Sequence, residues 1–163
     1  MMTQNMAQNK ETQRWMSLGT KVGAGLAKVW AVVTGHSGYL LDLNVIQANC
    51  SIVEYYYTGL QTVSLGQIRG SASTGRCHDF DANFRLLRDH NESRLTGVET
   101  ARRRGTKLPP VSLIQVGDMY FVEDGHHRIS VAKARGEQFI EAEVTVWRVT
   151  GALPWGEPKM ALA

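Results

Sequence analysis

Apolar and polar side chains alternate most regularly between residues 140 and 149. One face carries Ile140, Ala142, Val144 and Val146, and the other carries Glu141, Glu143, Thr145 and Trp147. A period of two predicts a strand. Upstream, two apolar runs at residues 111–115 and 119–122 flank Val116-Gly117-Asp118. We predict a β-hairpin there, with Gly117 at a positive φ.

A spacing of three to four residues indicates helices in four further segments. Residues 126–135 place Ile129 and Ala132 on one face and end at Gly136. Residues 92–104 place Leu95, Val98 and Ala101 on one face and end at Gly105. Shorter helices are predicted at residues 25–33 and at residues 82–87, the latter starting from Asp79-Phe80-Asp81.

The remaining segments complete an α+β organisation. A strand is predicted at residues 61–65, whereas residues 66–76 have the Gly and Ser content of a loop. Residues 39–46 form an apolar patch whose type the pattern leaves open. We therefore expect a flexible N-terminus at residues 1–15, a helical or apolar extension at 16–60, a mixed-sheet domain at 61–150 and a tail at 151–163. The extension either enlarges the core or forms the surface of a homodimer.

The composition of the chain indicates in which environment the protein is expected to fold. The chain has 163 residues, a formal net charge of +3 and 43% hydrophobic residues, enough for a packed core. Cys50 and Cys77 lack metal or redox spacing, so free thiols in a reducing cytoplasm are expected. The apolar stretch at residues 22–33 is interrupted by Lys28 and is shorter than the roughly 20 residues of a membrane span. We expect no membrane partner.

Candidate chemistry concentrates in the run Val122-Glu123-Asp124-Gly125-His126-His127-Arg128, where a predicted strand passes into a predicted helix. The free N–H groups at a helix start carry the positive end of the helix dipole. Gly125 would allow a ligand close to the backbone, and His126, His127 and Arg128 add donors. This arrangement predicts a phosphate site with Arg128 as the clamp, although a purely structural turn would use the same residues.

Two carboxylates precede this helix start. Asp124 is either a helix N-cap or a functional group that binds Mg²⁺ or accepts a proton. Glu123 is either exposed or functional, and strand alternation places it on the face opposite Asp124. The spacing of His and Cys residues does not favour zinc, so we expect no metal held by the protein alone.

Residues 62–149 resemble the ParB/sulfiredoxin superfamily. The resemblance rests on the hairpin leading into Asp-Gly-His-His-Arg at 124–128, the small-residue helix at 129–136, the closing strand at 140–144, and an opening strand at 62–68. It implies a small α+β unit that binds nucleotide phosphates at this helix start. It also implies that Arg69, Gly70 and Ser71, with residues 73–76, form a second wall of the pocket; an ordinary loop is the alternative.

Members of that superfamily differ in chemistry: CTP-hydrolysing partition proteins, an ADP-dependent serine kinase, sulfiredoxins and members described as nucleases. His126 stands where sulfiredoxins carry their Cys, so sulfiredoxin chemistry is not expected. Only 14 residues follow Val149, too few for the DNA-reading domain of partition proteins. The Gly-His-His-Arg string is most similar to kinase-like and stand-alone members.

Three functional hypotheses follow from the residues and the resemblance. In the first, residues 125–128 bind ATP, ADP or CTP with Mg²⁺, and Asp124 or Glu123 is the base in hydrolysis or transfer of the terminal phosphate. In the second, the protein is a non-catalytic DNA-associated module that uses the basic run Arg102-Arg103-Arg104, which is otherwise a solvated helix end. In the third, Asp79, Asp81 and Asp124 converge as a metal-dependent nuclease site.

Overall fold

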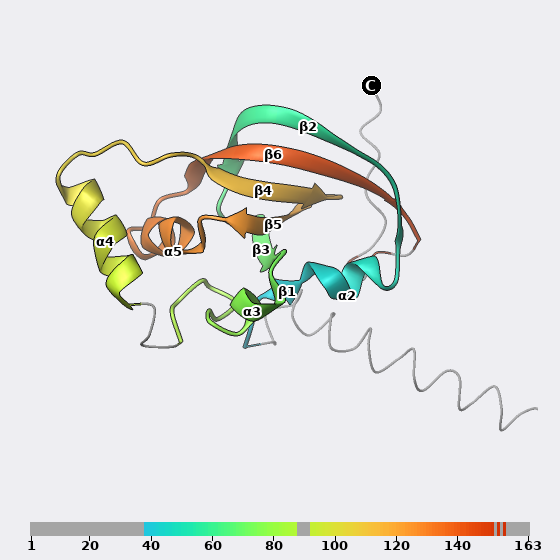
Figure 1. Ribbon diagram of the computed structural model, residues 1–163, viewed down its shortest axis with the longest axis horizontal. Coiled ribbons are helices and arrows are strands. Elements are labelled where there is room, and N and C mark those ends of the chain that lie inside the picture. The colour runs from blue at the N-terminus through green and yellow to red at the C-terminus, as the bar shows by residue number, and fades with distance from the viewer. Residues whose placement is uncertain (1–37, 88–91, 152, 154, 156–163) are drawn as a thin grey trace, which may run out of the picture.

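A computed structural model describes residues 38–87, 92–151, 153 and 155 of the chain. Its centre is one mixed sheet of six strands in the order β1-β3-β5-β4-β6-β2 (Figure 1). The strands are β1 (Leu41–Asp42), β2 (Ser51–Ser64), β3 (Ile68–Ser71), β4 (Val111–Val116), β5 (Met119–Asp124) and β6 (Phe139–Thr150). The helices are α2 (Leu43–Gln47), α3 (Thr74–Cys77), α4 (Glu92–Arg103) and α5 (His126–Ala134). The α+β class expected from the sequence is confirmed.

The hairpin of β4 and β5 forms the middle of the sheet. Its turn contains Gly117 at φ +62°, as the sequence predicts. On one side β3 pairs with β5 in parallel, and on the other β6 pairs with β4 in parallel. The antiparallel strand β2 then follows β6 to the edge. The predicted strand at residues 140–149 is confirmed, with Ala142 and Val144 buried and Glu141 and Glu143 exposed.

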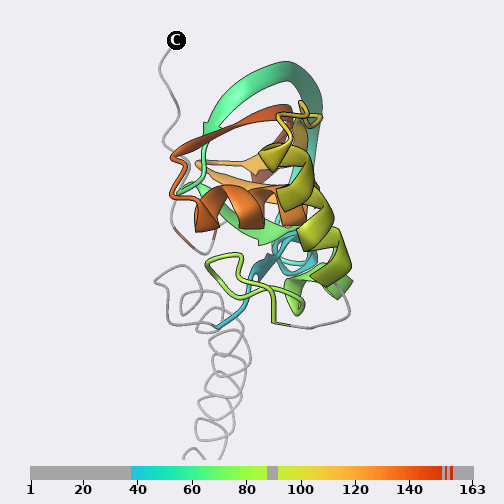
Figure 2. The same cartoon turned by 90° about the vertical axis from the view of Figure 1, so that its left-hand side faces the viewer.

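Two apolar clusters cover the two faces of the sheet. Beneath α5, Ile129 and Ala132 pack against Leu113, Val122 and other residues of the sheet. On the opposite face, Leu43 and Ile46 of α2 pack against Ile114 and Phe121. Helix α4 lies beside α5 (Figure 2), so the two predicted helices are confirmed and adjacent. This packing brings α4 to the start of α5.

Several segments differ from the sequence predictions. Strand β2 begins at Ser51 rather than near residue 61, so the expected boundary between residues 60 and 61 falls inside one strand. The expected loop at residues 66–76 contains β3 and α3. No helix forms at residues 82–87, because the Asp81 carboxylate accepts the backbone N–H groups of Asn83 and Arg85 and holds a turn.

The flexible terminus expected at residues 1–15, the helix expected at 25–33 and most of the tail expected at 151–163 lie outside the described residues. Within the part that is described, no helix is long and apolar enough to cross a membrane. Cys50 and Cys77 are both buried, and no disulfide joins them.

Candidate functional site

The junction between β5 and α5 is a single residue, Gly125. Its φ of +103° suits glycine, and it forms the N-cap of α5 without a side-chain capping bond. Of the two roles considered for Asp124, that of N-cap is therefore wrong, since Asp124 ends β5. A Cβ on Gly125 would lie 2.5 Å from Val111 Cγ1, so this glycine is required for packing against β4 rather than for the approach of a ligand.

A cavity of about 360 Å³ opens at this helix start. Residues 123–128 form one wall, Ser73 and Arg76 form a second, and Arg94 and Val98 of α4 form a third. The volume lies within the range of small-molecule sites. The first-turn N–H groups of an α-helix have no partner within the helix, so this end of α5 can donate to an anion.

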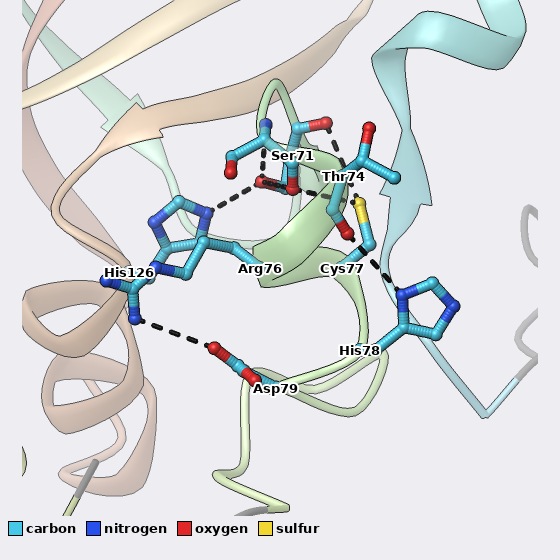
Figure 3. Close-up of polar contacts among 8 residues, drawn as sticks. Ser71, Thr74, Arg76, Cys77, His78, Asp79 and His126 are labelled. Atoms are coloured by element: carbon cyan, nitrogen blue, oxygen red, sulfur yellow. Dashed lines mark hydrogen bonds and ion pairs between the residues drawn. The ribbon is translucent and has the colours of Figure 1, made fainter. Parts of the chain in front are cut away.

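His126 is held rigidly in the wall of the cavity. Its Nε2 lies 2.8 Å from Ser71 Oγ, a contact drawn in Figure 3. Its ring stacks on Phe80 with centroids 5.7 Å apart. Burial, followed by the charges of Arg76 and His127, lowers the pKa of His126 to about 4. The ring is therefore neutral near pH 7 and acts as a hydrogen-bonding group rather than as a cation.

His127 takes a different position beside the same phenylalanine. Its ring meets Phe80 edge-on with centroids 5.4 Å apart. Burial lowers its pKa, and the charges of Arg76 and Arg94 lower it further. Its Nε2 is buried without a hydrogen-bond partner in the described structure. The two adjacent histidines therefore both line the cavity but make different contacts.

Arg128 is largely occupied by the protein itself. One guanidinium nitrogen, Nη1, donates to the carbonyl oxygens of Pro109 and Pro110, each at 2.6 Å. The other, Nη2, forms an ion pair with Asp124. Three of the five N–H donors of an arginine are thus in use. Arg128 lines the cavity, but most of its hydrogen bonds connect α5 to the segment that precedes β4.

Arg76 and Arg94 supply the other positive charges of the cavity. Arg76 lies beside the His126 ring and forms a 3.6 Å ion pair with Asp79 (Figure 3). Arg94 is exposed and shares a face of α4 with Val98, one turn further along. Sequence reasoning missed Arg94 and the Phe80 platform. The spacing of Arg94 and Val98 was the only available signal, because nothing local indicates that α4 packs on α5.

Glu123 and Asp124 both line the cavity, although strand alternation places them on opposite faces. The left-handed Gly125 turns the chain directly after them, at the end of the sheet. The Asp124 carboxylate is engaged by Arg128, whereas Glu123 is an exposed side chain. Of the two predicted bases, Glu123 is the one that is not in an ion pair with Arg128.

The second wall predicted from the resemblance is only partly present. Ser71 reaches the site through His126, and Ser73 and Arg76 line the cavity. Arg69 and Gly70 do not. Gly70 lies inside the sheet, where a Cβ would come within 2.4 Å of the Phe121 ring. Arg69 lies near the far half of α5, where its charge adds to burial in lowering the pKa of Lys133 to about 8.

The carboxylates expected for a nuclease are not brought together. Asp79 pairs with Arg76, Asp81 holds the turn at residues 81–85, and neither lines the cavity beside Asp124. Among the described residues no group of three or more His, Cys, Asp or Glu side chains is placed to hold a metal. The basic run also divides, because Arg102 forms an ion pair with Glu137 while Arg103 and Arg104 are exposed.

Comparison with solved structures finds a partial similarity to a sulfiredoxin. Sulfiredoxin from Arabidopsis thaliana superposes with a TM-score of 0.38 and 16% sequence identity, covering 52% of this chain and 82% of that one. It belongs to the superfamily that residues 62–149 resemble. A superposition of this extent is too partial to transfer the role of any residue. No family model and no curated protein matches the chain.

Proposed function

We propose that this protein binds the phosphate groups of a nucleotide in the cavity at the start of α5 and hydrolyses or transfers the terminal phosphate. The observation that carries the proposal is the N-terminus of α5, which has no side-chain capping bond and opens into a cavity bordered by Arg76, Arg94 and Arg128. A helix start supplies N–H donors and a positive dipole, and guanidinium groups supply matching charge.

Within this proposal the side chains divide the work. Arg94 and Arg76 contact the phosphates, because Arg128 is mostly engaged with Pro109, Pro110 and Asp124. His126 offers its Nδ1 to the ligand, since its Nε2 is held by Ser71. Neutral histidines add hydrogen bonds without net charge, so the affinity for an anion rests on the arginines and on the helix start.

Glu123 is the proposed base, orienting the water or acceptor hydroxyl that attacks the terminal phosphate. Mg²⁺ fits this site only together with a nucleotide, because the described residues hold no set of three protein ligands. Mg²⁺ commonly binds through one or two carboxylates plus substrate phosphates, and Glu123 and Asp124 are the carboxylates present. When bound, the ion would neutralise phosphate charge.

Thermal stability measured with ATP, ADP and CTP, each with and without Mg²⁺, tests binding. A ligand at about 100 times its Kd stabilises a protein by roughly 2.7 kcal/mol. We expect one nucleotide to stabilise the wild type and Arg94→Ala to weaken its binding at least about tenfold. Arg103→Ala is the matched control, because Arg103 is exposed on the same helix and does not line the cavity. Absence of stabilisation by every nucleotide would refute the proposal.

Turnover is tested separately by phosphate release or transfer with the nucleotide that binds. Glu123→Gln keeps the size of the side chain but removes its basicity. We expect turnover to fall by roughly 10² or more while the Kd changes little. Unchanged turnover in this variant would remove Glu123 from the mechanism, and binding without any turnover would limit the protein to a nucleotide-binding role.

A further inference from the structure

Strand β2 forms one edge of the sheet and is unusually apolar for an edge. It has 14 residues and packs mainly against β6 (Figure 1). Val53, Tyr55, Tyr57 and Leu60 are each between 60% and 74% exposed. An exposed strand edge presents unpaired N–H and C=O groups, which proteins commonly protect with Lys or Pro. Strand β2 contains neither.

The single charge in β2 is already compensated. Glu54 lies 3.4 Å from Arg148 of β6, and the Arg148 guanidinium also lies over the Tyr56 ring at 5.8 Å. Two register shifts, at Val53 and Thr58, increase the local twist. The run Glu54–Tyr57 between them remains in regular register with β6. A strand approaching this run meets aromatic side chains and no uncompensated charge.

We propose that β2 pairs with β2 of a second copy of this chain, forming an antiparallel homodimer with a sheet continuous across it. Antiparallel pairing of a strand with itself is self-complementary about a two-fold axis, the commonest symmetry of homodimers. Tyr55, Tyr56 and Tyr57 then form cross-strand aromatic pairs. This inference is independent of the nucleotide site.

The area at this edge suits a dimer of modest affinity. A buried aromatic side chain contributes about 150–250 Å². With three tyrosines and the exposed Ile52, Val53 and Leu60, pairing covers on the order of several hundred Å² per copy, approaching the roughly 800 Å² per partner of a standard interface.

Packing of the same strands face to face is less favourable. Residues directly opposite on antiparallel strands share a face, and Leu60 is opposite Glu143 while Thr62 is opposite Glu141. A two-fold contact through that face would bury Glu141 and Glu143 from both copies against like charges. Edge pairing leaves these exposed carboxylates in solvent.

Sedimentation equilibrium of the full-length protein tests the pairing. We expect a monomer–dimer equilibrium in the wild type, and at least about tenfold weaker association in Tyr55→Lys and Tyr57→Lys, because lysine is a natural blocker of edges. Val45→Lys is the control, since Val45 is an exposed apolar residue of α2 and lies outside β2. A monomeric wild type, or dimers unaffected by both tyrosine variants, would overturn the proposal.

Disulfide crosslinking provides a second readout that does not depend on how the lysine variants fold. The three variants are Tyr55→Cys, Tyr56→Cys and Tyr57→Cys. Only a residue near the two-fold axis lies close enough to the same residue of the second copy to form a disulfide with it. We expect one of these variants to crosslink as a dimer under oxidation. The wild type should not, because Cys50 and Cys77 are buried. Failure of all three variants to crosslink would count against antiparallel pairing at this edge.

Discussion

The β5–α5 junction and the β3–α3 segment look alike in sequence but differ in the folded protein. Each contains a glycine close to Arg and to a hydroxyl or imidazole side chain, and each was expected to form a wall of one pocket. The junction lies at the end of a central strand, so residues 123–128 line the cavity together. In the other segment, Arg69 and Gly70 lie within β3 and do not line the cavity. Ser71 connects to the site through His126, and Ser73 and Arg76 line the cavity.

The difference shows that the structural role of a glycine depends on where it lies relative to the sheet. Gly70 is enclosed between β1 and β5, beneath the Phe121 ring. Gly125 closes a strand and begins a helix with a positive φ. Neither glycine has space for a Cβ, so both are required by packing, but only Gly125 also sets the direction of a helix start.

The largest effect is expected for Gly125→Ala. The new Cβ would collide with Val111 and the residue would be strained at φ +103°. Overpacking and backbone strain each cost about 1–3 kcal/mol, so we expect a loss of about 4 kcal/mol in the free energy of unfolding. Urea denaturation measures it. Adding Val111→Ala should remove the collision with Cγ1 but neither the 2.9 Å approach to the Cβ of residue 111 nor the strain, so it should recover only part of the loss. A loss below about 1 kcal/mol in Gly125→Ala would contradict this account.

The next largest effect concerns pH and His126. Because its folded pKa of about 4 lies below the ordinary value of 6.5, the unfolded chain binds a proton in this window that the folded protein does not. Acidification from pH 6.5 to 4 should therefore cost on the order of 3 kcal/mol of stability from this group. Denaturation across this range, repeated with His126→Gln, measures the contribution; an equally steep loss in the variant would assign it to other groups.

Gly70→Ala should cost about 2 kcal/mol, through overpacking without backbone strain. Its Cβ would lie 2.4 Å from the Phe121 ring and 2.7 Å from the Leu41 carbonyl oxygen. Phe121→Leu in the same chain should recover part of the loss by vacating the ring position. If Gly70→Ala proves more damaging than Gly125→Ala, the proposed difference between the two glycines is reversed.

The smallest effect separates the two arginines of the β3–α3 segment. Arg76→Ala should weaken nucleotide binding about tenfold, or ~1.4 kcal/mol, because Arg76 lines the cavity. Arg69→Ala should leave the Kd unchanged, because Arg69 lies near Lys133 instead. Calorimetric titration of both variants compares them directly. Equal losses of nucleotide affinity in the two variants would indicate that Arg69 also contributes to the site.

The sequence predicts the central hairpin, α4, α5 and β6 because each has a regular apolar period and a glycine at its end. It does not predict the part of β2 that precedes residue 61, since Tyr55, Tyr56 and Tyr57 are exposed and give no alternation of buried positions. The helix expected at residues 82–87 is replaced by a turn, because the Asp81 side chain bonds the backbone that a helix would use.

The candidate site is predictable where it is contiguous and not where it is assembled from separate elements. Residues 123–128 were identified from one strand-to-helix junction. The bonds from Arg128 to Pro109 and Pro110, and the approach of Arg94 on α4, depend on tertiary packing across long sequence separations. Pattern reasoning alone therefore assigned the clamp to Arg128 and overlooked Arg94.

The central claim is that nucleotide phosphates bind at the start of α5. A two-dimensional ¹⁵N NMR titration with ATP, ADP or CTP tests it most directly, because the backbone amides of His126, His127 and Arg128 report on an anion at the helix start. The account predicts that these amides shift most, together with Arg94, and that the shifts saturate. Saturable shifts confined to other parts of the chain, or no shift with any of the three nucleotides, would contradict it.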